Sequence, residues 1–482
     1  MRLYFLPQIL SSIAVATFCF LNGLELSYLS ILIPYFTNND TRVENSFAMS
    51  DNEKSWLLSI GPIVKPLGCV LAGLVMDHIG RLNTLRVAVL PWSIGWLLIA
   101  KASSFLMIAA GFTITIFSFP WLLITAVTYI TEISSPSVRG MLVNLKTIFW
   151  CLGSMAMFLL GAFLHWRTIA WINCLLPLAP LFLSLLLKES MLWLVTRGRF
   201  EDAKKSLVYF NRYRKTSRDE NFDCVIDRKL LMIQTLHDRY RSINLSLLQK
   251  LKFFLQPSGY KRVLMVAGLE FFQNLSGSII VFSNIMVFFN EFGTTINPYA
   301  VGIYLGLTKL VITFCNIWLL KTFRFRIILI ASYLIISGCL VAFGLYIDFN
   351  PKDSSIYQWI PLCALILYSN SMVVGPYSVP VVLTPSVYPT HIRGTGQSVS
   401  SIIGHMLEFF MIQSYYAIKK GVKQSHILYF MSFSSLIACV YIYSWVVETR
   451  QKTFLEIENY FVKKDNKSNP RSLEEQDPCL EK

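Results

Sequence analysis

Residues 107–129 read MIAAGFTITIFSFPWLLITAVTY, a run that contains no charged side chain. About 20 consecutive apolar residues are enough for a helix to cross the hydrocarbon core of a bilayer. A core helix or strand of a soluble protein would be shorter and amphipathic. Similar runs recur through the 482-residue chain, which is 54% hydrophobic and only 15% charged. The sequence therefore predicts an all-α membrane protein and excludes a soluble globular one.

Twelve such runs divide the chain into two sets of six. They lie near residues 9–34, 55–75, 86–104, 107–129, 141–163, 169–187, 262–289, 300–320, 327–347, 359–383, 396–417 and 426–447. The first run is longer than the apolar core of a typical signal peptide and lacks a small-residue cleavage site, so we take it as a span. The expected parts are an N-terminal six-helix bundle (1–187), a cytoplasmic linker with short amphipathic helices (188–261), a C-terminal six-helix bundle (262–447) and a cytoplasmic tail (448–482).

The net charge of +15 is distributed in a way that indicates orientation. If the N-terminus is cytoplasmic, about 32 of the 43 Lys and Arg fall on the cytoplasmic side, as the positive-inside rule requires. These segments would then meet anionic lipid, and no nucleic-acid partner is expected. In the same topology Asn39 opens an Asn-Asp-Thr glycosylation sequence in the first outside loop. We therefore expect a multi-pass protein with both termini in the cytoplasm.

The order of six spans, a polar linker and six more spans indicates a class of function. It is the architecture of secondary transporters, whose solute site lies near mid-membrane between two halves. No zinc-protease motif, phosphate-binding loop or Ser/His/Asp order is present to indicate an enzyme. The ten cysteines form no CxxC or Cys/His spacing, so neither a metal site nor a redox site is expected. The sequence predicts a transporter of a small-molecule solute that needs no cofactor.

Six short motifs stand at the ends or in the cores of particular spans. They are DHIGR (77–81), EISSPSVRG (132–140), ESMLWL (189–194), QNLSG (273–277), PTHIRG (389–394) and ETRQKT (448–453). Each motif alone is weak, but all six occur in this order, each at the expected place. Together they resemble the sugar porter family of the major facilitator superfamily over about residues 9–460, and its facilitated trehalose transporter branch most of all.

This resemblance implies a major facilitator fold in the plasma membrane, with twelve transmembrane helices in two six-helix bundles. It implies facilitated diffusion of a sugar by alternating access, with trehalose as a candidate. It also implies a cytoplasmic gate built from Asp77, Gly80, Arg81, Glu132, Arg139, Glu189 and Arg393. In the alternative interpretation, these residues only anchor the ends of helices.

The resemblance also marks residues for substrate binding. The positions are Gln273, Asn274, Ser276, Thr147, Lys309 and His405. The first three keep amide and hydroxyl groups that suit a sugar. The family's downstream Asn of span seven and its span-ten Trp are replaced by Ile279 and Val381, and each unpaired sugar hydroxyl would cost about 1–3 kcal/mol. Either the substrate differs from an ordinary hexose or other groups form the cavity.

Charged residues inside the spans offer such groups. A charge at the bilayer centre costs about 2.5–3.5 kcal/mol, so these residues are expected to face a cavity or a partner. Glu25 stands where proton-coupled relatives carry an Asp, so one hypothesis is that it couples solute to proton movement. In a second, Glu25 or Glu270 forms an ion pair with Lys309, and in a third it is simply neutral or snorkels to the interface. Lys65 is expected to line a hydrated crevice, and Glu408 is a further acid within a span.

Two other functions stay open beside facilitated diffusion. One is a proton-coupled symporter of a sugar or another solute, and the other is a degenerate, transporter-like sugar sensor. Changes in the C-terminal motifs favour the sensor, whereas the retained Asp77, Glu132, Arg139 and Gln273 favour transport. In span ten, three prolines within ten residues predict a broken helix, because a proline lacks the N–H that a helix requires.

Overall fold

A computed structural model describes most of both halves of the chain. The described residues are 5–36, 50–212, 230–231, 254, 257–283, 298–349, 359–388, 393–419 and 421–448. Within them every element is helical. The Asn39 sequence and the C-terminal tail beyond residue 448 lie outside the described residues, as does most of the expected linker.

The N-terminal half contains six spans. They are α1 (Leu6–Tyr35), α2 (Asp51–Ile79), α3 (Arg81–Ala100), α4 (Phe105–Ile133), α5 (Pro136–Phe163) and a sixth divided into α6 (Trp166–Leu175) and α7 (Leu178–Leu185). The sixth span is divided next to Pro177, which cannot donate a helical hydrogen bond. Two short helices follow, α8 (Met191–Thr196) and α9 (Phe200–Asn211), and α9 covers an amphipathic stretch of the expected linker.

The C-terminal half repeats this layout. Its elements are α12 (Pro257–Leu275), α13 (Ser278–Ser283), α15 (Pro298–Thr322), α16 (Phe325–Phe349), α17 (Trp359–Met372), η3 (Val373–Tyr377), α18 (Ser378–Val387), α19 (Arg393–Lys419) and α20 (Gln424–Trp445). The π-helical turn η3 contains Pro376 and separates α17 from α18, which confirms the predicted break in span ten. Span seven is interrupted at Gly277, whose φ is +82°.

Eleven helical segments of the described residues are long and apolar enough to cross a membrane. The segment at the predicted eleventh span, α19, has sufficient length with 27 residues. It is not among the eleven, because the polar residues His405, Glu408 and Gln413 lower its hydropathy. It packs against α2 and α12 inside the helical assembly, where polar side chains can find partners.

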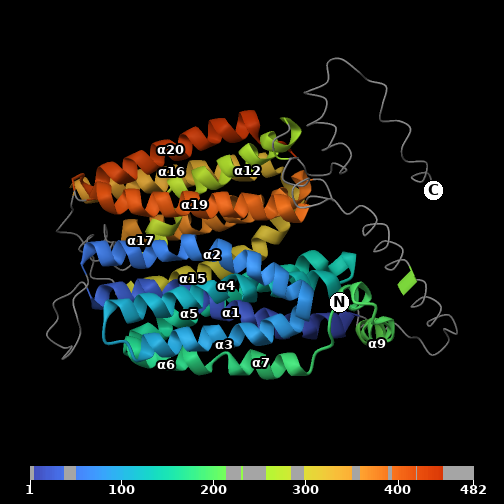
Figure 1. Cartoon of the computed structure of the whole chain (residues 1–482). Coiled ribbons are helices and arrows are strands. Elements are labelled where there is room, and N and C mark those ends of the chain that lie inside the picture. Colours follow the sequence, from blue (N-terminus) through green and yellow to red (C-terminus); the bar gives the residue numbers. More distant parts are fainter. Residues whose placement is uncertain are drawn as a thin grey trace, which may run out of the picture.

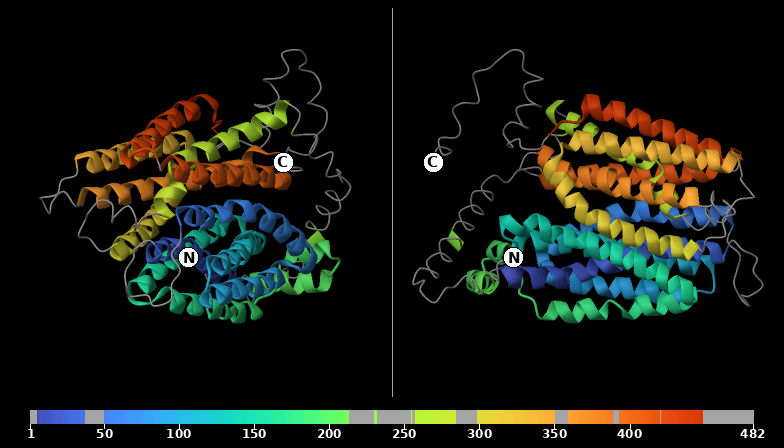
Figure 2. Two further views of the ribbon diagram at one scale, coloured as in Figure 1. Left: turned by 60° about the vertical axis from the view of Figure 1, so that its left-hand side comes forward. Right: turned by 180° about the vertical axis from the view of Figure 1, so that it is seen from behind.

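The helices form two bundles, one from each half of the chain, as Figures 1 and 2 show. The N-terminal core contains Trp92, Trp96 and Tyr28, all fully buried, with the rings of Tyr28 and Trp96 4.8 Å apart. A second core fills the C-terminal bundle, where Ser337 and Ser432 share a 2.8 Å hydrogen bond. Each bundle therefore has its own packed interior.

The bundles meet along two pairs of helices, α2 with α19 and α5 with α15. We call the end where α1 begins and α9 lies the linker face, and the other end the opposite face (Figure 1). Near the opposite face the Ser30 hydroxyl donates to the carbonyl of Phe282 at 2.9 Å. There the Ser55 hydroxyl also donates to Gln413 Oε1 at 3.1 Å. These polar contacts join the bundles near the opposite face.

Candidate functional site

The turn between α2 and α3 is built around Gly80. Its backbone has φ +100° and ψ 168°, a conformation that only glycine adopts readily. A Cβ at this position would lie 2.8 Å from Glu189 Oε2 and 3.3 Å from Trp193 Cη2. Both the backbone and its surroundings therefore require glycine here.

Glu189 caps the first turn of α3. Its carboxylate accepts hydrogen bonds from the backbone N–H groups of Arg81 at 3.2 Å and Leu82 at 3.0 Å. These N–H groups have no partner within the helix, and a negative charge is favourable beside the positive end of the helix dipole. Burial raises the pKa of Glu189, while the N–H donors oppose that rise. The carboxylate thus fixes the start of α3 to the segment that follows span six.

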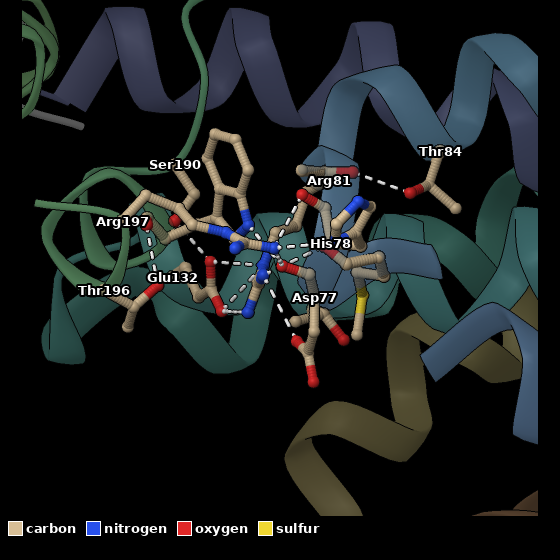
Figure 3. Close-up of polar contacts among 12 residues, drawn as sticks. Asp77, His78, Arg81, Thr84, Glu132, Ser190, Thr196 and Arg197 are labelled. Carbon is tan, nitrogen blue, oxygen red and sulfur yellow. Dashed lines mark hydrogen bonds and ion pairs between the residues drawn. The ribbon is translucent and has the colours of Figure 1, made fainter. Parts of the chain in front are cut away.

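Arg81 and Glu132 form a buried ion pair at the linker face. Arg81 Nη2 lies 2.8 Å from Glu132 Oε1, and Arg81 Nε lies 3.1 Å from Oε2 (Figure 3). Their side chains are only 11% and 12% exposed, so water screens this pair weakly. Ser190 donates its hydroxyl to the same carboxylate. Asp77 lies 3.4 Å from Arg81 but is 75% exposed, which makes it the weaker partner.

Two residues after span six complete this arrangement. Trp193 Nε1 donates to the carbonyl of Asp77 at 2.8 Å, and Arg197 Nη2 donates to the carbonyls of Asp77 and His78 at 2.9 and 2.8 Å. These carbonyls end α2 and would otherwise lack partners. The sequence marked this segment as a motif but gave no role to Trp193 or Arg197.

The structure brings together five of the seven predicted gate residues. We call these five, Asp77, Gly80, Arg81, Glu132 and Glu189, the clasp. Arg139 lies outside it, because among the described residues its exposed guanidinium donates to the carbonyl of Ser134 alone, at 3.4 Å. Arg393 begins α19, and its side chain lies outside the described residues. The clasp therefore joins ends of α2, α3 and α4 to the α8 segment within one bundle.

The C-terminal half has a counterpart of Glu189. Glu448, which follows α20, accepts hydrogen bonds from the backbone N–H groups of Phe325 at 3.3 Å and Arg326 at 3.2 Å. These residues begin α16, just as Arg81 and its neighbour begin α3. The two halves therefore share a helix-capping carboxylate in equivalent places, as expected of structural repeats.

The predicted substrate residues of α12 differ in how freely their side chains can reach a solute. Asn274 Nδ2 donates to the carbonyl of Glu270 at 3.0 Å and to that of Gly404 at 3.5 Å. The fully buried Ser276 donates to the carbonyl of Gln273 at 2.9 Å. Gln273 itself is half-buried. Two of the three side chains, Asn274 and Ser276, therefore already donate hydrogen bonds to backbone carbonyls.

Thr147 on α5 and Lys309 on α15 belong to the second pair of helices that joins the bundles, and both are half-buried. Lys309 Nζ lies 3.8 Å from the ring centroid of Phe282, a cation–π contact. Among the described residues no carboxylate lies within 4.0 Å of this ammonium. The suggested ion pair of Lys309 with Glu25 or Glu270 is therefore not formed in this structure.

A different ion pair lies between the bundles. Lys65 Nζ on α2 is 3.4 Å from Glu408 Oε1 on α19, with side chains 15% and 8% exposed. His405 Nδ1 lies 2.9 Å from the other oxygen of Glu408.

Glu25, the predicted coupling residue, is only 3% exposed on α1. Within the described residues no group of three or more His, Cys, Asp and Glu could hold a metal.

Comparisons with known proteins agree with this geometry. The family model described as "Sugar (and other) transporter" matches residues 11–461. The facilitated trehalose transporter Tret1 of Polypedilum vanderplanki is 28% identical over 95% of this chain and 88% of its own length. Tret1 of Apis mellifera ligustica is 27% identical over 94% of this chain and 88% of its own.

Solved structures show the same fold. The inward-open xylose transporter XylE of E. coli superimposes with a TM-score of 0.74 at 16% identity, covering 93% of this chain and 98% of that one. The proton:xylose symporter XylE bound to 6-bromo-6-deoxy-D-glucose superimposes with a TM-score of 0.70 at 16% identity, over 95% and 99% of the two chains. The predicted major facilitator fold is thus confirmed, and the chain belongs to the sugar (and other) transporter family.

Proposed function

We propose that this multi-pass membrane protein transports a sugar by facilitated diffusion through alternating access. The observation that carries the proposal is the family match over residues 11–461, which includes both bundles and the linker. Trehalose is the first candidate substrate, because relatives that align with most of this chain are named facilitated trehalose transporters. The two-bundle fold supports the mechanism, since solute passes between halves that rock against each other.

The orientation we propose places the linker face in the cytoplasm of a cell whose plasma membrane holds the protein. The expected linker, residues 188–261, carries about 16 Lys and Arg, and such segments stay on the cytoplasmic side. Both termini would then be cytoplasmic. The polar contacts of Ser30 and Ser55 would lie toward the outside, where they hold the bundles together.

In this orientation the clasp forms the N-terminal part of the cytoplasmic gate. The buried contact of Arg81 with Glu132 and the capping contact of Glu189 tie three helices and the linker into one unit. An alternating-access transporter needs such a unit, because each bundle must move without coming apart. Arg393 and Arg139 complete the predicted gate residues, and we propose that they act when the bundles meet at this face.

A specific observation favours proton-coupled symport as a second candidate. Glu25 is buried at 3% exposure, and within the part of the chain that the structure describes neither carboxylate oxygen has a hydrogen bond of good geometry. An acid without compensation inside a span is costly to keep charged, which suits a group that takes up and releases a proton. The sugar sensor remains a third candidate, because Ile279 and Val381 remove two family contacts.

Uptake into proteoliposomes of labelled trehalose, glucose and a non-sugar solute, with and without an inward proton gradient, separates these functions. Facilitated diffusion predicts that trehalose equilibrates without accumulating and that the gradient has no effect. Accumulation that Glu25→Gln abolishes would support symport, and binding without uptake would support the sensor. Uptake of the non-sugar solute alone would contradict the proposal.

A further inference from the structure

The Lys65–Glu408 pair is the charged contact that crosses between the bundles at mid-membrane. Lys65 lies about halfway along α2, and Glu408 lies near the middle of α19. The 3.4 Å contact joins residues 343 positions apart and is largely shielded from solvent. Since α2 and α19 belong to different bundles, any motion that separates these helices must break this pair.

Breaking the pair without replacement would be costly. An isolated charge inside a membrane, or a buried charge that has lost its partner, is strongly unfavourable. Glu408 retains His405, whose Nδ1 lies 2.9 Å from its second oxygen. The Glu270 carboxylate on α12 lies beside Gly404, one turn before Glu408, and its like charge cannot compensate Glu408. Lys65 would retain no carboxylate on α19, so it needs another partner when the helices separate.

Glu25 is a buried acid of the N-terminal bundle. It lies on α1 at 3% exposure, and among the described residues neither of its carboxylate oxygens has a hydrogen bond of good geometry. The neighbouring Thr115 hydroxyl donates to the carbonyl of Phe112 at 3.0 Å. Asn22, one turn before Glu25 on α1, donates to the carbonyl of Phe119 at 3.4 Å. Phe119, whose ring the Lys65 ammonium faces, therefore lies beside both Lys65 and the part of α1 that carries Glu25.

The helix α2 is irregular around Lys65. Gly61 lies one turn earlier, and a Cβ added there would be in van der Waals contact with Lys65 Cε, at 3.7 Å. Pro62 and Pro66 flank Lys65 and remove two N–H donors from the helix, which favours a bend at this point. Lys65 Nζ also lies 5.7 Å from the ring centroid of Phe119 on α4, a contact that supports the cation on its own bundle.

We propose that Lys65 exchanges carboxylates during transport. It pairs with Glu408 while α2 and α19 are together, and with Glu25 when they separate. Lys65 is thus a positioning residue that keeps a buried charge compensated in both orientations and sets the balance between them. The inference rests on the alternating access proposed above, and it assigns to Glu25 a fixed counter-charge rather than a proton.

A cysteine reporter at the interface can measure that balance. Ser55 is 5% exposed and contacts Gln413 across the bundles, so Ser55→Cys should react with a membrane-impermeant maleimide only when the opposite face opens. Labelling is measured on intact cells expressing the full chain, and the signal of the chain without Ser55→Cys is subtracted. Surface expression of each variant is measured in the same cells.

Two kinds of variant should shift the labelling rate in opposite directions. Glu408→Gln removes the pair formed when α2 and α19 are together but leaves Glu25 as a partner in the separated state, so labelling should rise roughly tenfold. Lys65→Arg keeps the charge and should stay within about threefold of the parent. The swap of Lys65→Glu with Glu408→Lys restores the pair but places a carboxylate against Glu25. Its labelling should fall below that of the parent, and adding Glu25→Lys should restore it.

General destabilisation cannot produce both shifts, so the pattern of the variants supports the exchange. Equal labelling of the parent and Glu408→Gln would overturn it, and so would a swap variant that labels like the parent. If the parent reporter never reacts and trehalose uptake also fails, alternating access itself is wrong and the exchange falls with it. A parent that reacts but is indifferent to these substitutions overturns the exchange alone.

Discussion

Gly80→Ala is the substitution whose effect the structure defines most closely. Gly80 has φ +100° and ψ 168°, outside the regions that alanine adopts without strain. The added methyl group would also lie 2.8 Å from Glu189 Oε2 and 3.2 Å from its Cδ. The substitution must therefore strain the turn and push away the carboxylate that caps α3.

The two effects can be weighed separately. A residue held in such a backbone region costs about 1–3 kcal/mol. Losing the cap on the N–H groups of Arg81 and Leu82 costs about 1 kcal/mol more. The expected loss is therefore about 2–4 kcal/mol of stability, a large share of the 5–15 kcal/mol that holds a typical protein folded. Because the turn belongs to the clasp, sugar uptake should also fall.

Two other glycines serve as matched controls. Gly198 has φ +70° with no atom near an added Cβ, so Gly198→Ala should show the backbone cost alone, about 1–2 kcal/mol. Gly73 lies within α2 at negative φ, also with open space, and Gly73→Ala should be neutral or stabilise the helix by up to about 1 kcal/mol.

The assay is the temperature at which half of the detergent-solubilised protein loses its monodisperse peak on size exclusion. Gly73→Ala should match or exceed the parent, Gly198→Ala should fall below it, and Gly80→Ala should be lowest. The reasoning is refuted if Gly80→Ala is as stable as the parent. It is also refuted if Gly198→Ala is equally damaging, because the contact with Glu189 would then contribute nothing.

Three further predictions concern the clasp, its repeat and the topology. Glu132→Gln leaves the Arg81 guanidinium without its buried counter-charge and should lower uptake in vesicles by at least about tenfold, whereas Asp202→Asn, which removes an exposed partner of Arg199, should stay within about twofold. Glu448→Gln weakens the cap on α16 and should lower the midpoint temperature by the equivalent of about 1 kcal/mol; an unchanged midpoint would contradict the capping role. In eukaryotic cells Asn39→Gln should abolish a glycosidase-sensitive shift in gel mobility, and its persistence would contradict the assigned outside loop.

The sequence was sufficient to predict the fold, because span length and charge asymmetry are direct consequences of the bilayer. The clasp was also largely predictable. Asp77 and Arg81 are one helical turn apart, and the motifs at Glu132 and Glu189 place acids at the same membrane face. Arg139 was assigned to the same contacts, although its side chain points into solvent there. Spacing along the chain indicates which face a residue reaches, but not which neighbour it contacts.

Contacts across the bundles could not be predicted in the same way. Lys65 and Glu408 stand 343 positions apart, and their meeting depends on how α2 rotates against α19. The sequence showed that each was an expensive charge within a span but not that they compensate each other. Lys309 was the more obvious cation for an acidic partner, yet its ammonium lies over the ring of Phe282. Asn274 similarly offered an amide to a sugar, while its side chain donates to backbone carbonyls.

Counterflow in proteoliposomes tests sugar transport by alternating access most directly. Vesicles containing the purified protein are loaded with unlabelled trehalose and diluted into a trace of labelled trehalose. A carrier whose site faces one side at a time predicts a transient accumulation of label above the outside concentration, absent from protein-free vesicles. Label that only equilibrates at the rate of protein-free vesicles, with trehalose and with glucose alike, would contradict sugar transport by this protein.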